Sequence, residues 1–135
     1  MTGPLLVLAV LAALIAAVAH VGFFALESVL WSRPRVWRLF GVRSQQDADT
    51  MRFLAYNQGF YNAFLALGAG AGVVLILSGV AVEAGIALTL FALLAMTLAA
   101  VVLVTGDPRL WRGALIQGSI PAVGAALIVA HLLVG

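Results

Sequence analysis

Residues 4–31 read PLLVLAVLAALIAAVAHVGFFALESVLW, and this stretch decides the class of fold. A helix needs about 20 apolar residues to cross the hydrocarbon layer of a bilayer, and this run is long enough. Two ionisable residues, His20 and Glu27, interrupt it. A charge at the centre of a span costs roughly 2.5–3.5 kcal/mol even on insertion scales, so such groups usually face the protein interior and serve a function. The stretch therefore predicts a membrane span with a functional face.

The composition of the whole chain is also that of a membrane protein. Of the 135 residues, 64% are hydrophobic and 9% are charged, and the mean hydropathy is +1.18. The absence of cysteine excludes disulfides, thiolate metal sites and dithiol redox chemistry. Every basic residue is an arginine beside an apolar run. This placement favours a role in membrane orientation over nucleic-acid binding.

Four apolar runs have the length of a membrane span, at about residues 4–31, 49–78, 82–105 and 110–134. The connections after the second and third runs are short, which favours antiparallel neighbours. In the last connection Asp107 can cap the following helix, and Pro108 suits its first turn. The sequence thus predicts an all-α fold, in which residues 1–135 form a single integral membrane domain. We expect an antiparallel bundle of four transmembrane helices.

The charges are distributed unevenly between the two sides of this bundle. The first and third loops, with their flanks, carry all the arginines: Arg33, Arg35, Arg38, Arg43, Arg52, Arg109 and Arg112. The other side has the two termini and Glu83. Because arginine concentrates on the cytoplasmic side of membrane proteins, we expect the Arg-bearing loops in the cytoplasm and both termini on the outer side.

The first loop interleaves its arginines with apolar residues such as Trp37 at roughly helical spacing. That pattern is typical of a short amphipathic segment lying in the membrane interface, with its arginines on anionic lipid. An irregular loop anchored by its apolar side chains is an equally good interpretation.

Polar and aromatic residues share one face of the first predicted span. His20, Phe23, Phe24, Glu27 and Trp31 recur at intervals that form a single stripe at about 100° per residue. His20 and Glu27 are two turns apart, about 10 Å along the axis, so a substrate would fit between them.

The second and fourth predicted spans carry further polar groups. Asn57 and Tyr61 share a face of the second span, and Asn62 lies about 140° from Asn57. On the fourth span Pro121 has no N–H, which leaves the carbonyl of Gln117 without its helical donor. Such a break is tolerated in a membrane only against protein or a wet cavity.

These groups lie at similar depths. Counted at 1.5 Å per residue from the cytoplasmic ends, Glu27 lies about 6 Å in, Gln117 about 10 Å, Asn57 about 12 Å, and His20 and Tyr61 about 16–18 Å. We therefore expect a polar pocket in the cytoplasmic half of the bilayer.

We assign the roles of this pocket from residue chemistry. The candidate catalytic residues are His20, Glu27 and Tyr61, and the candidate substrate-binding residues are Phe24, Trp31, Asn57, Asn62 and Gln117. One histidine, one glutamate and amides make a poor transition-metal set, so we expect no metal and no other cofactor.

Three segments carry a family resemblance: AHVGFFALE at residues 19–27, NQGFYNAFLA at 57–66 and QGSIPA at 117–122. They resemble the small bacterial membrane proteins of the domain of unknown function 1304 family, over nearly the whole chain. The resemblance implies a four-helix integral membrane protein and, with the charge distribution, the bacterial cytoplasmic membrane. Ala63, where relatives often carry glycine, and the longer Arg-rich first loop depart from the family. The resemblance implies no particular activity.

Three classes of function stay open. The first is a pocket that binds a hydrophobic or lipid-like small molecule, with isomerisation or another acid–base modification if the protein is an enzyme. The second is a proton-coupled transporter or exporter of small amphipathic molecules, which requires a homodimer, with Gly68 and Gly72 as the contact. The third is a module whose polar layer holds a lipid or partner helix. The sequence favours the pocket and leaves enzymatic activity undecided.

Overall fold

The computed structural model describes residues 3–134, and the regular structure of these residues is entirely helical. Four long helices make up the fold: α1 (Pro4–Phe24), α3 (Gln45–Ser78), α4 (Val82–Gly106) and α5 (Trp111–Val134). Three short elements accompany them: a π-helical turn η1 (Ala25–Val29), the helix α2 (Pro34–Leu39) and a 3-10 turn η2 (Pro108–Leu110). The predicted all-α fold is confirmed.

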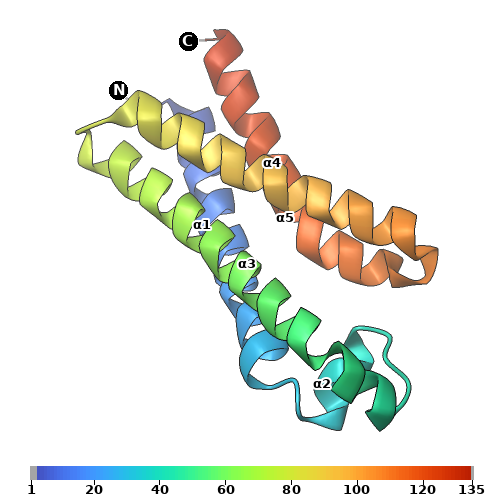
Figure 1. Cartoon of the computed structure of the whole chain (residues 1–135). Coiled ribbons are helices and arrows are strands. Elements are labelled where there is room, and N and C mark those ends of the chain that lie inside the picture. The colour runs from blue at the N-terminus through green and yellow to red at the C-terminus, as the bar shows by residue number, and fades with distance from the viewer. Residues whose placement is uncertain (1–2, 135) are drawn as a thin grey trace.

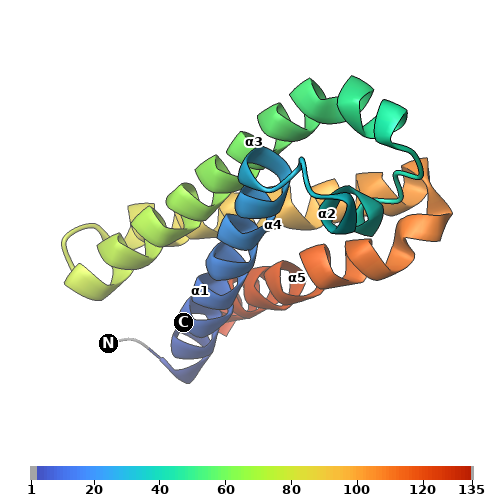
Figure 2. The same ribbon diagram turned by 90° about the horizontal axis from the view of Figure 1, so that it is seen from below.

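The long helices form a ring rather than a layer. α1 and α4 each pack against both α3 and α5, and α1 and α4 hardly touch across the bundle. The first and last described residues lie at one end, whereas α2 and the α4–α5 turn lie toward the other (Figures 1 and 2).

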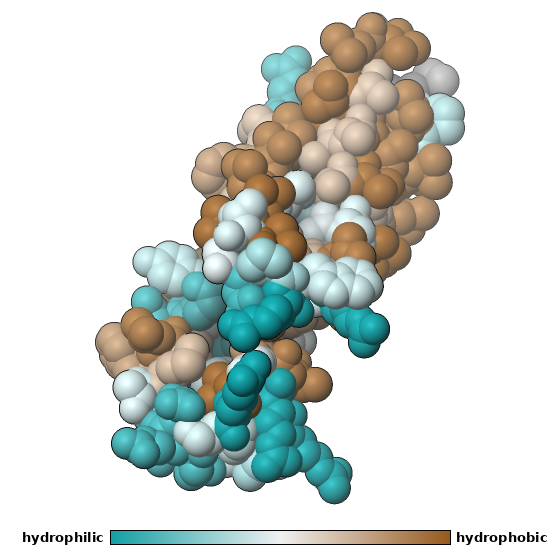
Figure 3. Space-filling view, turned by 90° about the vertical axis from the view of Figure 1, so that its right-hand side faces the viewer, coloured by the Kyte–Doolittle hydropathy of each residue, from teal (hydrophilic) through white to brown (hydrophobic). Residues whose placement is uncertain are grey.

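The surface of the bundle carries large apolar side chains on every long helix. Val18, Phe91 and Ile116, for example, are each more than half exposed. Hydrophilic residues gather instead at the end of the molecule that holds α2 (Figure 3). All four long helices, α1 together with η1 and α5 together with η2, are long and apolar enough to cross a bilayer. An apolar belt of this extent indicates a multi-pass membrane protein.

Two of the helix ends follow local capping rules. α3 begins at Gln45, earlier than the expected start near Asp49, because the Ser44 hydroxyl accepts a hydrogen bond from the Asp47 N–H at 3.1 Å. α3 ends at Ser78, and the residue after it, Gly79, has a φ of 71°, in the left-handed region that glycine tolerates. The short turn that follows reverses the chain into α4.

The turn between α4 and α5 is capped as expected. The Asp107 carboxylate accepts a hydrogen bond from the Arg109 N–H at 3.0 Å and pairs with the Arg109 side chain at 2.9 Å. These hydrogen bonds hold the pKa of Asp107 below its ordinary value. Pro121 lies inside α5, and the helix bends along its length in Figure 1, as a proline in a helix interior predicts.

The first span differs from the expectation. The regular α-helix ends at Phe24 rather than continuing to Trp31, and the next turn is π-helical. Trp31 therefore lies beyond the helix, and the stripe expected from His20 to Trp31 at 100° per residue is interrupted. The physical cause lies in the packing of η1 against α3, described below.

The first loop does contain a helix, but two of its apolar residues face the protein, whereas Leu39 is exposed. Val36 and Trp37 of α2 are buried, and the Trp31 indole N–H donates to the Ala48 carbonyl at 2.9 Å. A compact apolar cluster ties α2 to the start of α3; its members are Trp31, Trp37, Val42, Ala48 and Ala55, with Phe40 against them. Apolar side chains that we expected in the lipid interface thus pack within the chain.

Small residues bring α3 and α4 into close contact. A Cβ added at Gly72 would clash with the Thr89 side chain and lie 2.8 Å from the Gly85 carbonyl oxygen. Gly68 faces the same helix, with Ala92 the nearest neighbour of its missing Cβ. The expectation that Gly68 and Gly72 form a homodimer contact is wrong, because α4 of the same chain covers that face.

We predict that Gly72→Ala lowers the free energy of unfolding by about 1–3 kcal/mol, because the added methyl group would push α4 away from α3. The matched control is Gly70→Ala on the same helix, where nothing lies within 4 Å of the added atom. That variant should change the same quantity by less than about 1 kcal/mol. Unfolding of both proteins by denaturing detergent, followed by circular dichroism, measures the difference. Equal effects would contradict the packing described here.

Candidate functional site

A hydrogen bond between two side chains joins the first two long helices at the polar end of the bundle. The Asn62 side-chain amide on α3 donates to Oε2 of Glu27 in η1 at 2.7 Å. Only 8% of Glu27 and 4% of Asn62 is exposed. The other carboxylate oxygen, Oε1, has no hydrogen-bond partner within residues 3–134. It is also not one of the fully buried side-chain atoms that lack a partner, so it remains accessible. Glu27 is therefore anchored through one oxygen and open through the other.

The π-helical turn places Glu27 at this position. The Ser28 hydroxyl donates to the Tyr56 carbonyl of α3 at 2.8 Å. Ser28 also occupies the space that a Cβ at Gly59 would need, since its backbone nitrogen lies 3.0 Å from that point. π-helical turns are rare and frequently occur at functional sites. Here the close approach to Gly59 holds the carboxylate against Asn62.

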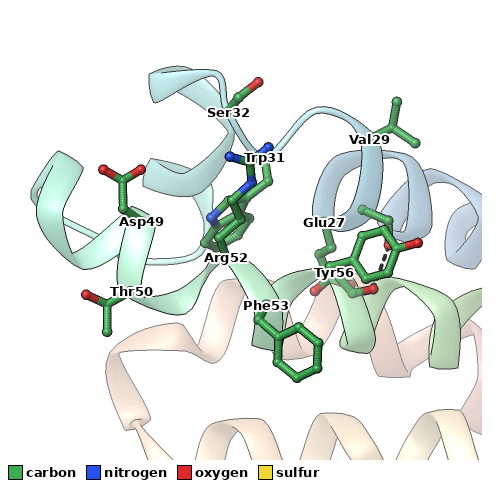
Figure 4. Close-up of a pocket in the computed structure, with 10 residues that line it drawn as sticks. Glu27, Val29, Trp31, Ser32, Asp49, Thr50, Arg52, Phe53 and Tyr56 are labelled. Atoms are coloured by element: carbon green, nitrogen blue, oxygen red, sulfur yellow. Dashed lines mark hydrogen bonds between the residues drawn. The ribbon is translucent and has the colours of Figure 1, made fainter.

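Beside Glu27 lies a hollow of about 510 Å³, between η1, the loop that follows it and the first half of α3 (Figure 4). We call it the Glu27 hollow. Its lining residues are Glu27, Ser28, Val29, Trp31, Ser32, Asp49, Thr50, Arg52, Phe53 and Tyr56. Polar groups and aromatic rings share this lining, so both parts of an amphipathic molecule would find partners.

His20 lies apart from this hollow. Its side chain is 0% exposed, and its ring packs edge-on against Phe23 with centroids 5.3 Å apart. Nδ1 lies 2.9 Å from the Ala16 carbonyl oxygen, so Nδ1 carries the proton and Nε2 is left as an acceptor. Within the described part of the chain, Nε2 is buried without a partner.

The remaining predicted site residues divide between the hollow and other surfaces. Trp31 lines the hollow, and Phe24 packs against Phe60 nearby, with ring centroids 5.1 Å apart. Tyr61 is 57% exposed and Asn57 is also exposed, on a face of α3 outside the hollow. Gln117 is half-buried on α5.

The structure therefore brings together Glu27, Asn62 and Trp31 of the eight predicted residues. It does not gather Tyr61 and Gln117 with them, and it seals His20 away from the hollow. The chemical roles assigned to all eight residues stay predictions.

Several lining residues escaped the sequence analysis. Asp49, Arg52 and Tyr56 line the hollow but are not among the predicted site residues. Their spacing at i, i+3 and i+7 does place them on one face of α3, and that periodicity was the available signal. The close approach of Ser28 to Gly59 could not be predicted from the sequence, because a glycine within a span is consistent with close packing against any neighbouring helix.

The arrangement favours binding and proton exchange over covalent chemistry. The Glu27 Oε1 atom can accept a hydrogen bond or a proton from a group in the hollow. Within residues 3–134, no group of three or more His, Cys, Asp and Glu side chains is arranged to hold a metal ion.

Four long apolar helices with a buried carboxylate between the first two are the features of a small polytopic helical protein of the membrane type. A family model described as "Protein of unknown function (DUF1304)" matches residues 14–129, and the chain belongs to this family. The match spans His20, Glu27 and Asn62, and it confirms the resemblance seen in the sequence. Neither the curated proteins nor the solved structures contain a match to the chain.

We predict that Asn62→Leu destabilises the protein by about 1–3 kcal/mol, because the Glu27 carboxyl group would lose its buried donor. Asn57→Leu is the control on the same helix, since Asn57 is exposed and makes no hydrogen bond within residues 3–134. Its free energy of unfolding should stay within about 0.5 kcal/mol of wild type or rise slightly. Detergent-unfolding curves of the two variants test this. An Asn62→Leu protein as stable as wild type would mean that the hydrogen bond contributes nothing.

Proposed function

We propose that this protein resides in the bacterial cytoplasmic membrane and binds an amphipathic, lipid-like molecule in the Glu27 hollow. The observation that carries the proposal is the state of the Glu27 carboxylate. One oxygen is fixed by Asn62 at 2.7 Å, and the other is left to the hollow. Nearly buried carboxylates are expensive to maintain, and they usually serve a ligand or a proton.

The lengths of the elements support a position at the membrane surface. The α-helical part of α1 has 21 residues, and at 1.5 Å per residue it spans about 30 Å, the thickness of the hydrocarbon layer. Glu27 follows directly after this segment, on the side of the arginines. With the Arg-bearing loops in the cytoplasm and both termini outside, the hollow lies at the cytoplasmic interface.

The lining of the hollow supports an amphipathic ligand. Asp49, Thr50 and Arg52 form one polar side, whereas Val29 and Phe53 offer apolar surface. In Figure 4 the polar side chains Asp49, Thr50 and Arg52 lie to the left of Phe53, Tyr56 and Val29. The volume of about 510 Å³ lies within the range of small-molecule sites. A molecule with a polar head and an apolar tail would satisfy both sides while its tail remains in the bilayer.

In this hollow, acid–base chemistry by the predicted catalytic residues would run through Glu27. It is the one candidate catalytic residue that lines the hollow, because His20 is sealed and Tyr61 lies on another face of α3. A two-group mechanism with His20 therefore requires the bundle to open between them. Binding, with Glu27 as anchor and proton acceptor, is the function that the geometry supports best.

We expect native mass spectrometry of gently extracted protein to show a retained amphipathic molecule, and Glu27→Gln to lose most of it. The substitution keeps the size of the side chain but removes its charge. Glu83→Gln is the matched control, because Glu83 is an exposed glutamate in the first turn of α4, outside the hollow. It should retain the same molecule as wild type.

Two results would refute the proposal. One is equal retention by wild type and Glu27→Gln, and the other is the same loss in Glu83→Gln. Circular dichroism and gel filtration of each variant must first show an intact fold, so that loss of ligand is not loss of structure.

A further inference from the structure

We infer that the head group bound in the Glu27 hollow is zwitterionic, with a primary ammonium group at Glu27 and an anionic group, such as a phosphate, at Arg52. The inference rests on the proposed function and names the ligand class for the same hollow. Two observations support it: the charges of the side chains that line the hollow, and the charged atoms among them that have no partner within residues 3–134.

The charge of the lining excludes a purely anionic head as the best partner. The ten lining residues include two carboxylates, Glu27 and Asp49, and a single guanidinium, Arg52. An anion alone would add to the excess of negative charge beside Glu27. A neutral head without N–H or O–H donors would leave Oε1 of Glu27 without a hydrogen bond in a nearly buried place.

An ammonium group matches what Glu27 lacks. It supplies up to three N–H donors and a positive charge, and a charge-assisted hydrogen bond is roughly twice as strong as a neutral one. The rings of Tyr56 and Phe53 line the same hollow, and aromatic faces attract cations. A quaternary ammonium has the charge but no N–H donor, so this site distinguishes the two.

Arg52 provides the second half of the recognition. Within residues 3–134 its guanidinium makes no ion pair within 4.0 Å, although Asp49 and Glu27 line the same hollow. Asp49 instead accepts a hydrogen bond from the Gln45 side chain at 2.9 Å. Guanidinium groups bind phosphate and carboxylate through paired N–H donors. Figure 4 shows Arg52 and Glu27 apart among the lining residues, as the two charged ends of a dipolar head would require.

The apolar side of the hollow gives the tail an exit. Val29 and Phe53 line the hollow and are both mostly exposed. Since each belongs to a helix long and apolar enough to cross a bilayer, an acyl chain can continue from them into the bilayer. A zwitterionic head on an acyl tail thus fits the lining from end to end.

The test uses the full chain in detergent with three short-chain phospholipids that share a phosphate and differ in the rest of the head: phosphatidylethanolamine, phosphatidylcholine and phosphatidylglycerol. We expect the ethanolamine lipid to bind at least about tenfold more tightly than the other two, as one added charge-assisted hydrogen bond predicts. Titration by calorimetry or native mass spectrometry measures the three dissociation constants. Water-soluble phosphoethanolamine, which has the head but no tail, is the fourth ligand.

Variants separate the two ends of the head group. Glu27→Gln should reduce the preference for ethanolamine over choline to about onefold while phosphate-dependent binding persists. Arg52→Gln should weaken all three lipids by about tenfold and keep their order. Arg35→Gln is the control for arginine loss, because Arg35 is exposed on α2 and does not line the hollow.

The outcomes distinguish this inference from the proposed function. Equal binding of the three lipids by wild type, with loss in Glu27→Gln, overturns the head-group inference and leaves the hollow as an amphiphile site. Lipid binding that neither Glu27→Gln nor Arg52→Gln alters overturns both. If phosphoethanolamine binds as tightly as the ethanolamine lipid, the zwitterionic head is upheld and the lipid tail is overturned. The order of the wild-type constants decides the matter even if a variant fails to fold.

Discussion

The hydrogen bond between Asn62 and Glu27 is the interaction on which the polar end of this molecule depends. A carboxylate at the end of an apolar helix needs a donor, and α3 supplies one only if it comes very close to η1. Gly59 permits that approach, and Ser28 fixes it through the Tyr56 carbonyl at 2.8 Å. The departure from α-helical geometry in η1 follows from this contact, and so does the direction in which Glu27 meets the hollow.

The rest of the bundle is held by close helix contacts at small residues, together with a core of larger side chains such as Leu93, Met96 and Ile128. Gly72 and Gly85 let α3 and α4 touch through backbone atoms, and Gly118 on α5 lies against Ala100 of α4. Helices in lipid gain little from burying apolar surface, so dispersion between closely packed backbones has to hold them together. Many other large apolar side chains lie on the outside of the bundle, where they form the apolar belt.

Features governed by local chemistry were predictable from the sequence, and features governed by contact between distant segments were not. The turns at Gly79 and Asp107 follow from left-handed glycine and from side-chain capping. The π-helical turn could not be predicted, because its cause is Gly59, more than thirty positions along the chain, roughly the length of a whole span. The packing of Trp37 was likewise missed, since an amphipathic pattern does not distinguish a lipid surface from a protein surface.

The polar layer expected at one depth separates into two environments with different consequences. Glu27 lines the hollow, so its unfilled oxygen can exchange partners without disturbing the bundle. His20 is sealed among apolar helices, and within residues 3–134 its hydrogen-bond partner is the Ala16 carbonyl alone. Any new partner for Nε2 requires α1 to separate from its neighbours. A ligand of the proposed kind would therefore meet Glu27 first. In this arrangement His20 would sense a ligand in the hollow only through a change in helix packing.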